Sequence, residues 1–440
     1  MVFARKEGNL LNPDTMLPAD LTVVIQSAQL TFERRPFLRP LRLSSGTITD
    51  ITEARADVTV TIDGKTATGH GAIYLSDLWA WPDPARTPAG RDAAMRTFAG
   101  QRAAALPSIV GGDAGHPLEA GLRLHRAALD TDSELPPLAR LVSVSPLDAA
   151  LHDAAGQALN RSAFALYDRD YPVPAADRYF PGSGACAAIR ALLQQPSARE
   201  IAATLVVGKG DDLSTLSPWI TERGYACFKL KVGGADPSED ARRVSEVFAW
   251  ACGLGVAAPR LTVDANCAAP DAETTRRFAD ILADTDPDAF AALDSIEQPT
   301  GRDIGVHAFD WHAVAARRPV LIDEGLTDWD SLETAQAQGW NGMAVKTCRG
   351  HSFSLAAAAW AHRRDWTLTM MDLTNPGYAA IHSALFAAHL PGVTNMEMNA
   401  AQYTPAANEA WLPRLAPLLE PTNGVHYLPY PAPSGLGGSL

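Results

Sequence analysis

The 440-residue sequence lacks the marks of several protein classes. Its five cysteines are scattered and form no C-x-x-C pair, which argues against a disulfide framework or structural zinc site and favours a reducing compartment. No apolar run is long enough to cross a bilayer, and residues 1–7 contain no apolar core of a signal peptide. The histidines form no H-E-x-x-H pattern. We therefore expect a cytoplasmic protein that does not span a membrane.

Positive charge is also scarce. The formal net charge is −13 and there is no long basic run, so neither nucleic acid nor an anionic membrane is an expected partner. The stretch Gly208–Asp211 reads Gly-Lys-Gly-Asp and lacks the spacing of a phosphate-binding P-loop. By contrast, 47% of the residues are apolar, which over this length suffices for a large core and predicts two or three domains.

The first part of the chain has the alternating pattern of strands. An Asp63-Gly64 pair between two such runs is a strong signal for a hairpin turn. Residues 91–165 are rich in alanine and leucine and are expected to be helical. Strands followed by helices predict an α+β domain. The strands are expected at 21–25, 48–51, 56–62 and 66–73.

The boundaries of this domain follow from the same pattern. Residues 1–20 are expected to form an N-terminal arm, and residues 21–175 the α+β domain. Residues 32–45 are dominated by Arg, Pro and Leu and are expected to form a long loop that reaches another domain. Residues 176–202, with one short helix, are expected to be a connection or insertion.

From residue 203 onward, short apolar strands alternate with helices, which predicts a (β/α)₈ barrel of the TIM type over residues 203–405. The fold class is therefore α/β, with an N-terminal α+β domain. The C-terminal segment 406–440 ends in a Pro-, Gly- and Ser-rich tail and is expected to return to the N-terminal domain. The barrel strands are expected at 203–207, 226–231, 260–264, 292–297, 319–323, 342–346, 367–372 and 393–397.

Two lysines alternate with apolar residues in the stretch Phe228–Val232. Side chains alternate along a strand, so Lys229 and Lys231 face one side and the apolar residues face the helices on the other. Asp236 and Glu239 then form a capping box at a helix start, which places the lysines at the carboxyl end of the strand. Alone, the pattern also fits the solvated face of an edge strand, where lysine is common.

Three successive barrel strands end in a carboxylate, namely Asp264, Glu297 and Asp323. One such acid is usually a helix cap or a loop residue. Three on adjacent strands converge on the barrel face where active sites lie, and they would repel one another without a cation. Oxygen ligands alone favour a hard ion such as Mg²⁺.

The next strand ends in Lys346, which is expected to face the barrel interior. A lone lysine at a strand end usually extends to water. Here, strands two and six lie on opposite sides of an eight-membered ring, so Lys346 faces Lys231 across the barrel mouth. Nearby positive charge and partial burial would lower the pKa of such a lysine, so that one of the two could act as a base near neutral pH.

Together these residues resemble the enolase superfamily, and the K-x-K pair with the lysine of strand six resembles its muconate-lactonising-enzyme-like subgroup (the mandelate racemase/muconate lactonising enzyme family). The resemblance covers the whole chain. It implies that the N-terminal domain is a capping domain and that residues 32–45 close over the substrate. The motif residues are Lys229-x-Lys231, Asp264-x-Asn266, Glu297-Gln298-Pro299, Asp323-Glu324 and Lys346.

The resemblance implies roles for these residues. Mg²⁺, with Mn²⁺ as a substitute, would be bound by Asp264, Glu297 and Asp323. Lys231 and Lys346 would be the acid/base pair on opposite faces of the substrate. Lys229 would hold the substrate carboxylate and depress the pKa of Lys231. The remaining residues, Asn266 and Glu324, would contact the metal ligands or the substrate.

The resemblance also implies the chemistry, which is removal of the proton α to a carboxylate through an enediolate. Because two opposed lysines can each serve one face, we expect racemisation or epimerisation of a small carboxylate such as an amino-acid derivative. The alternatives are a lyase that eliminates water, a cycloisomerase, and an inactive barrel that only binds its ligand. A homo-oligomer is also expected.

Two strand ends depart from known subgroups. Strand seven carries Asp372 and lacks the histidine base of the mandelate-racemase-like enzymes. Strand eight reads Glu397-x-Asn399, a poor match to the Asp-x-Asp of dipeptide epimerases. Asp372 and Glu397 are expected to face inward, where each would bind a polar substrate group or be satisfied by backbone donors.

Overall fold

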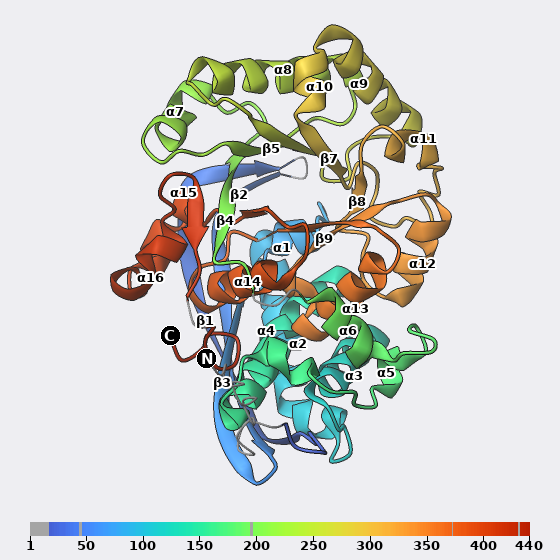
Figure 1. The fold of residues 1–440 in the computed structure, drawn as a ribbon, viewed down its shortest axis with the longest axis vertical. Helices are drawn as coiled ribbons and strands as arrows, with labels where there is room; N and C mark the ends of the chain where they lie inside the picture. Colours follow the sequence, from blue (N-terminus) through green and yellow to red (C-terminus); the bar gives the residue numbers. More distant parts are fainter. Residues whose placement is uncertain (1–16, 44–45, 194–196, 372, 430–431) are drawn as a thin grey trace, which may run out of the picture.

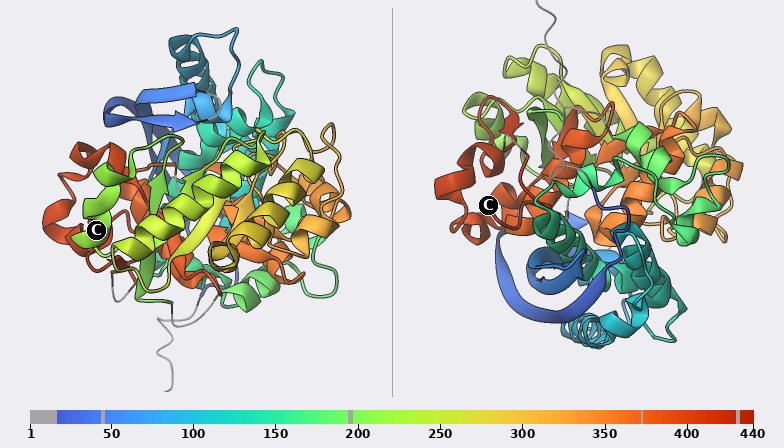
Figure 2. Two further views of the ribbon diagram at one scale, coloured as in Figure 1. Left: turned by 90° about the horizontal axis from the view of Figure 1, so that it is seen from above. Right: turned by 60° about the horizontal axis from the view of Figure 1, so that its bottom comes forward.

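The computed structural model has two parts, an N-terminal cap and a barrel (Figure 1). We call the part from Val24 to Leu159 the cap, and the part from Glu200 to Glu397 the barrel. Figure 2 shows the strands of the cap, in blue, on one side of the green-to-red barrel helices. The structure describes residues 17–43, 46–193, 197–371, 373–429 and 432–440.

The cap is built on an antiparallel sheet of β1 (Val24–Leu43), β2 (Gly46–Ile62) and β3 (Lys65–Tyr74) in that order. The hairpin turn is confirmed, because Asp63 and Gly64 have φ of 50° and 71°, as a type I′ turn requires. Four helices complete the cap: α1 (Asp77–Ala80), α2 (Pro88–Val110), α3 (Pro117–Asp130) and α4 (Pro137–Leu159).

Helix α4 lies directly on the cap sheet, in contact with β2 and β3. Two glycines of β3 allow this approach. A Cβ atom at Gly69 would lie 2.0 Å from the backbone nitrogen of Ala154, and one at Gly71 would lie 2.1 Å from the carbonyl oxygen of Pro146. The sheet side of α4 is therefore packed backbone against backbone, and its other side is free to contact the barrel.

The prediction of a loop over residues 32–45 is wrong for residues 32–43, because these residues belong to β1. Strand β1 pairs with β2 from Val24 opposite Thr61 to Leu43 opposite Gly46, with a register shift between Pro36 and Leu41. Prolines are tolerated there because β1 has a partner on one side only. Residues 44–45 lie outside the described residues.

The predicted (β/α)₈ barrel is confirmed. Eight parallel strands follow one another around the ring, and β11 pairs with β4 to close it. Each overlaps one of the predicted strands. They are β4 (Glu200–Val207), β5 (Cys227–Lys231), β6 (Arg260–Asp264), β7 (Leu293–Glu297), β8 (Val320–Ile322), β9 (Gly342–Val345), β10 (Thr367–Met370) and β11 (Asn395–Glu397).

Helices surround the barrel, and the outward side chains of the strands pack against them, as Phe228 of β5 does against Trp250 of α8. Within the described residues, no helix combines the length and apolarity needed to span a membrane. The remaining helices are α5 (Pro174–Asp177), α6 (Ala185–Leu192), α7 (Leu213–Thr221), α8 (Pro237–Gly253), α9 (Ala272–Thr285), α10 (Pro287–Ala291), α11 (His312–Ala315), α12 (Trp329–Ala337), α13 (His351–His362), α14 (Gly377–His389), α15 (Ala400–Tyr403) and α16 (Leu412–Leu419).

The C-terminal segment contacts both parts of the molecule. An additional strand, β12 (Val425–Tyr427), pairs antiparallel with β4 of the barrel. The tail then reaches the cap, where Asp153 of α4 accepts the backbone N–H groups of Leu436 at 2.7 Å and Gly438 at 3.0 Å. The same carboxylate accepts the N–H of His70 in β3 at 2.9 Å. Asp153 therefore joins the tail, a helix and the sheet.

We predict that Asp153→Ala lowers the free energy of unfolding by about 2–4 kcal/mol, because buried backbone donors lose a charged acceptor. Hydrogen exchange in residues 434–440 should rise as well. Denaturant titration measures the first effect and mass spectrometry the second. Asp168→Ala, which removes a surface carboxylate paired with Arg161, is the control and should change neither. An unchanged stability of Asp153→Ala would contradict the role of this carboxylate.

Candidate active site at the barrel mouth

Nine of the ten predicted site residues form one connected cluster at the carboxyl ends of the barrel strands, whereas Asp372 lies outside the described residues. The strand register explains their closeness. Lys231 lies opposite Asp264 on the neighbouring strand, and Asp264 lies opposite Glu297 on the next. Their side chains therefore emerge at one level of the ring.

Each lysine of the cluster forms an ion pair with at least one carboxylate. The ammonium of Lys231 lies 2.5 Å from Asp264 Oδ2, and that of Lys346 lies 2.5 Å from Asp323 Oδ2. Lys229 is the most connected, because its ammonium lies 2.8 Å from Glu297 Oε1, 3.2 Å from Asp264 Oδ2 and 2.9 Å from Glu397 Oε2. The cluster is thus held together by alternating charges.

The same pairs shift the pKa values of Lys346 and Lys229. Burial alone would lower the pKa of Lys346, but Asp323, with Glu297 and Glu324, outweighs burial and raises it. For Lys229, burial is likewise outweighed by Glu297, Glu397 and Asp264, and its pKa is also raised. The expectation of a lowered pKa at Lys346 is therefore wrong for this structure, in which the carboxylates hold the ammonium form.

Burial and the neighbouring charges shift the pKa values of two carboxylates in opposite directions. Burial alone would raise the pKa of Asp323, but Lys346 and Arg349 lower it below its ordinary value. For Glu297, burial dominates, and with Asp264 and Asp323 nearby it raises the pKa to about 8 despite the contact with Lys229. Of the three acids predicted to bind the metal, Glu297 is therefore the one that holds a proton most readily in this arrangement.

Two predicted neighbours of the acids contact them as expected. The amide of Asn266 donates to Glu324 Oε1 at 3.0 Å and to Asp264 Oδ2 at 3.3 Å. Burial raises the pKa of Glu324, and the charges of Asp323 and Asp264 raise it further. Whether these residues act in a reaction stays a prediction.

Trp79, which comes from α1 of the cap, was not among the predicted site residues. Its indole N–H donates to Glu324 Oε1 at 3.0 Å, and the ammonium of Lys346 lies 4.5 Å from its ring centre. A cation over an aromatic face is attracted by the ring. The sequence carries no signal for this contact, because Trp79 lies in a four-residue helix far from the strand ends.

Arg349 was missed as well. Its guanidinium donates to the backbone oxygen and to Oδ1 of Asp323, both at 2.5 Å, and to the carbonyl of Ala344 at 3.0 Å. Arg349 follows Lys346 by three residues at the end of a 3₁₀ turn (Thr347–Arg349), so the spacing was a usable signal. The guanidinium supplies a fixed positive charge behind Asp323.

A small cavity of about 40 Å³ lies beside the three lysines, between the barrel mouth and the cap. Glu397 and Asn399 border it on the barrel side. This volume is small beside the roughly 300–1,000 Å³ of typical small-molecule sites. Its roof consists of apolar side chains from β1 and β2: Phe37, Leu41, Leu43, Ile48 and Ile51.

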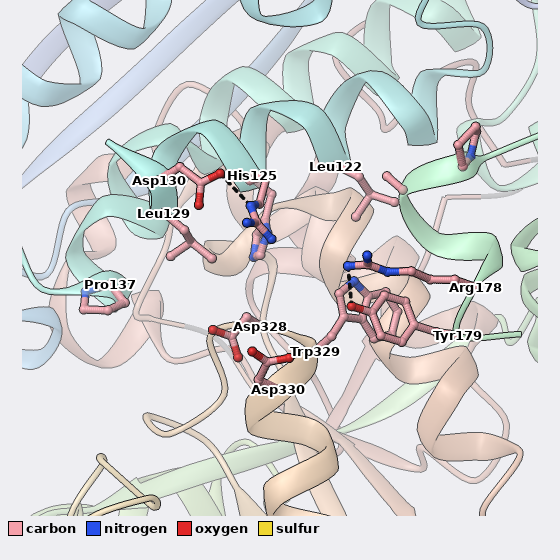
Figure 3. Close-up of a pocket in the computed structure, with 13 residues that line it drawn as sticks. Leu122, His125, Leu129, Asp130, Pro137, Arg178, Tyr179, Asp328, Trp329 and Asp330 are labelled. Atoms are coloured by element: carbon pink, nitrogen blue, oxygen red, sulfur yellow. Dashed lines mark hydrogen bonds and ion pairs between the residues drawn. The ribbon is translucent and has the colours of Figure 1, made fainter. Parts of the chain in front are cut away.

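A larger cavity of about 560 Å³ lies elsewhere, between α3, α5 and the start of α12 (Figure 3). Several of the side chains that line it contact one another. Arg126 pairs with Asp130 at 2.6 Å, and Tyr179 stacks on Trp329 with ring centres 4.1 Å apart. None of the predicted site residues borders it, so its size alone does not make it the reactive site.

Residues 214–439, slightly more than half of the chain, match the family model described as enolase C-terminal domain-like. The chain belongs to the enolase superfamily. A comparison with curated proteins finds no significant match.

Solved structures confirm the fold of this superfamily member. A muconate lactonizing enzyme from Pseudomonas fluorescens complexed with muconolactone is 18% identical, with a TM-score of 0.64 over 94% of this chain and 96% of that one. A dipeptide epimerase from Enterococcus faecalis V583 complexed with Mg and a dipeptide is 16% identical (TM-score 0.63, 94% and 99%). An enolase from Bradyrhizobium complexed with magnesium and mandelic acid is 20% identical (TM-score 0.62, 94% and 95%).

Members of the enolase superfamily bind Mg²⁺, and two of these similar structures contain it. In the described part of this chain, no three His, Cys, Asp or Glu side chains are grouped closely enough to hold a metal ion. The donor set nevertheless fits a hard cation, because Asp264, Glu297 and Asp323 offer only oxygen. Among the described residues, Glu297 Oε2 is buried without a hydrogen-bond partner, which leaves it available as a ligand.

We predict that Mg²⁺ stabilises the wild-type protein and that Glu297→Gln removes this effect. A ligand at a hundred times its Kd adds about 2.7 kcal/mol to the free energy of unfolding. Thermal unfolding with Mg²⁺ and with EDTA measures the difference. Equal stabilisation of both proteins by Mg²⁺ would show that the ion binds elsewhere.

The same variant tests the raised pKa of Glu297. Without metal, the folded protein keeps a proton that the unfolded chain loses, because the pKa rises from 4.5 to about 8 on folding. The free energy of unfolding should therefore fall between about pH 4.5 and 8. Glu297→Gln should show a smaller fall over this window in EDTA, and an identical fall would contradict the assignment.

Proposed function

We propose that this protein is a Mg²⁺-dependent isomerase that removes and returns the proton α to a carboxylate, racemising or epimerising a small carboxylate such as an amino-acid derivative. The observation that carries the proposal is the placement of Lys231 and Lys346. Their strands, β5 and β9, are separated by β6–β8 on one side of the ring and by β10, β11 and β4 on the other. The two ammonium groups therefore approach the mouth from opposite sides.

The two lysines would exchange roles with the direction of the reaction. One amine takes the α-proton from one face and leaves an enediolate, and the opposite ammonium returns a proton to the other face, which inverts the carbon. For the other enantiomer the roles reverse. Lys229, which borders the same cavity, would attract the substrate carboxylate.

Asp264, Glu297 and Asp323 would hold the metal ion, which supplies positive charge to the substrate carboxylate when bound. In this structure the ammonium groups of Lys231 and Lys346 compensate two of these acids instead. If a divalent cation compensated these acids, the ammonium groups would no longer pair with them. The lysines would then lose the contacts that favour their protonated forms. The pKa of Lys346, which the carboxylates raise in this structure, should then fall toward the range in which an amine acts as a base.

The side chains that the cap places over the lysines favour a substrate with an apolar group. The side chains that roof the lysine cavity from β1 and β2 are apolar, with Leu41 and Ile48 both buried. A charged group placed against them would lose its water without gaining a partner. The part of the substrate that points away from the carboxylate is therefore expected to be apolar.

The two-base proposal is tested by exchange of the α-proton in D₂O with Mg²⁺, using both enantiomers of N-acetylamino acids and 2-hydroxy acids. Lys231→Ala should slow exchange from one enantiomer and Lys346→Ala from the other, each by roughly 10²–10⁴-fold. Mass spectrometry measures the deuterium incorporated. If a single lysine governs both enantiomers, a lyase or cycloisomerase reaction becomes the better account. If no probe exchanges, the proposal fails for these substrate classes.

The apolar roof is tested by Leu41→Asp. We expect this variant to lose exchange with N-acetylleucine more than with N-acetylalanine, because the longer side chain depends on the roof. Leu38→Asp is the matched control, since Leu38 lies on the same strand but is 76% exposed. Equal losses for both probes, or equal losses in both variants, would count against an apolar substrate group.

A further inference from the structure

The helices that follow the two opposed lysines are capped in different ways. After Lys231, α8 starts with its own cap, because the Asp236 side chain accepts the N–H of Ser238 at 2.9 Å. After Lys346, the N-cap residue of α13 is Gly350, which has a φ of 91° and no side chain that could accept a hydrogen bond. The first N–H groups of a helix need an acceptor when they are buried. For α13, this acceptor comes from the cap.

The acceptor for the first N–H groups of α13 is the carboxylate of Asp148 in α4. Its Oδ2 accepts the backbone N–H of Ser352 at 2.8 Å, and its Oδ1 accepts the Ser352 hydroxyl at 2.8 Å. Asp148 is 2% exposed. Burial alone would raise its pKa, but His152 and Ser352 lower it, so the carboxylate carries the negative charge that a helix N-terminus favours.

The surrounding backbone is shaped for this contact. A Cβ atom on Gly121 of α3 would lie 1.9 Å from Ser352 Oγ and 2.1 Å from Asp148 Oδ1. A Cβ atom on Gly350 would lie 2.7 Å from Asp148 Oδ2. Two glycines thus make room for a cap carboxylate at the start of a barrel helix.

The start of α13 is tied back to Lys346 by short hydrogen bonds. The hydroxyl of Ser354 donates to the carbonyl oxygen of Lys346 at 2.6 Å. The N–H of Gly350 donates to the carbonyl of Thr347 at 3.0 Å, and that of Ser354 to the carbonyl of Gly350 at 3.1 Å. Residues 346–354 therefore form one hydrogen-bonded unit, and a shift of the helix start displaces Lys346.

The cap also contacts the far end of this lysine, where the Trp79 ring lies 4.5 Å from the ammonium. Lys346 is thus held by the cap at its side chain and at its backbone. Lys231 differs, because its ammonium pairs with Asp264 of the barrel and the next helix carries its own cap. The cap therefore fixes one lysine of the pair far more than the other.

We propose that Asp148 is a positioning residue through which the cap sets the place of Lys346 but not of Lys231. Its effect on catalysis rests on the proposed two-base function. Proper docking of the cap on α13 would then be required to place the lysine at one face of the substrate, while the lysine at the other face is held by a barrel residue.

The test compares Asp148→Ala with Asp153→Ala in the full-length protein. Both replace a buried acid of α4 that accepts backbone N–H groups, but Asp153 holds the C-terminal tail instead of α13. Hydrogen–deuterium exchange, read by mass spectrometry, should rise in residues 346–354 for Asp148→Ala. For Asp153→Ala it should rise in residues 434–440 and remain as in the wild type over 346–354.

The second readout is α-proton exchange in D₂O with Mg²⁺ from both enantiomers of N-acetylleucine. Asp148→Ala should slow the enantiomer that Lys346→Ala affects most, by about tenfold or more relative to the other, since a misplacement of 1 Å costs about 10²-fold. Asp153→Ala should leave the ratio of the two rates unchanged. Asp148→Asn, which keeps an acceptor for Ser352, should return the ratio of the two rates most of the way to its wild-type value.

Two results would overturn the proposal. One is unchanged hydrogen exchange over residues 346–354 in Asp148→Ala, and the other is an equal loss for both enantiomers. If Asp148→Ala does not fold, Ser352→Ala removes one of the two hydrogen bonds and should give the same changes at smaller size. If the wild type exchanges neither enantiomer, the proposed function fails for this probe, while hydrogen exchange still decides whether Asp148 fixes residues 346–354.

Discussion

The structure depends on the pairing of buried carboxylates with buried cations at the barrel mouth. Among the described residues, five carboxylates and four cations meet at the barrel mouth, and a buried charge without a partner is very costly. The strand register places acids beside lysines, and the cap covers them with an indole and apolar side chains. The acids are Asp264, Glu297, Asp323, Glu324 and Glu397, and the cations are Lys229, Lys231, Lys346 and Arg349.

The barrel and most of this cluster could be predicted because both follow from local periodicity. Alternation along β5 separates Lys229 and Lys231 from the apolar residues, and successive parallel strands place Asp264 and Glu297 on one level. The start of β1 was predicted, but residues 32–43 were not, because their prolines and arginines indicate a loop and only pairing with β2 overrides that preference. The contact of Trp79 with Lys346 depends on how the cap docks, which no sequence spacing encodes.

The cap is more than a cover in this chain. Its sheet supplies the apolar roof, its short helix α1 places Trp79, and its long helix α4 carries two buried acids with separate partners. Asp153 holds the tail, whereas Asp148 holds the start of the helix after Lys346. An interface of this kind links the docking of one part of the molecule to the place of a side chain in the other, because packed interfaces do not deform continuously.

The central claim is that Asp264, Glu297 and Asp323 share one divalent cation, with lysines compensating them in its absence. The most direct measurement is anomalous scattering from crystals soaked in Mn²⁺, whose signal locates the ion and its ligands. The account predicts one Mn²⁺ bonded to oxygens of all three acids, with the ammonium groups of Lys231 and Lys346 no longer within ion-pair distance of Asp264 and Asp323. A Mn²⁺ bound elsewhere, or unchanged lysine–carboxylate pairs with no ion between these acids, would contradict it.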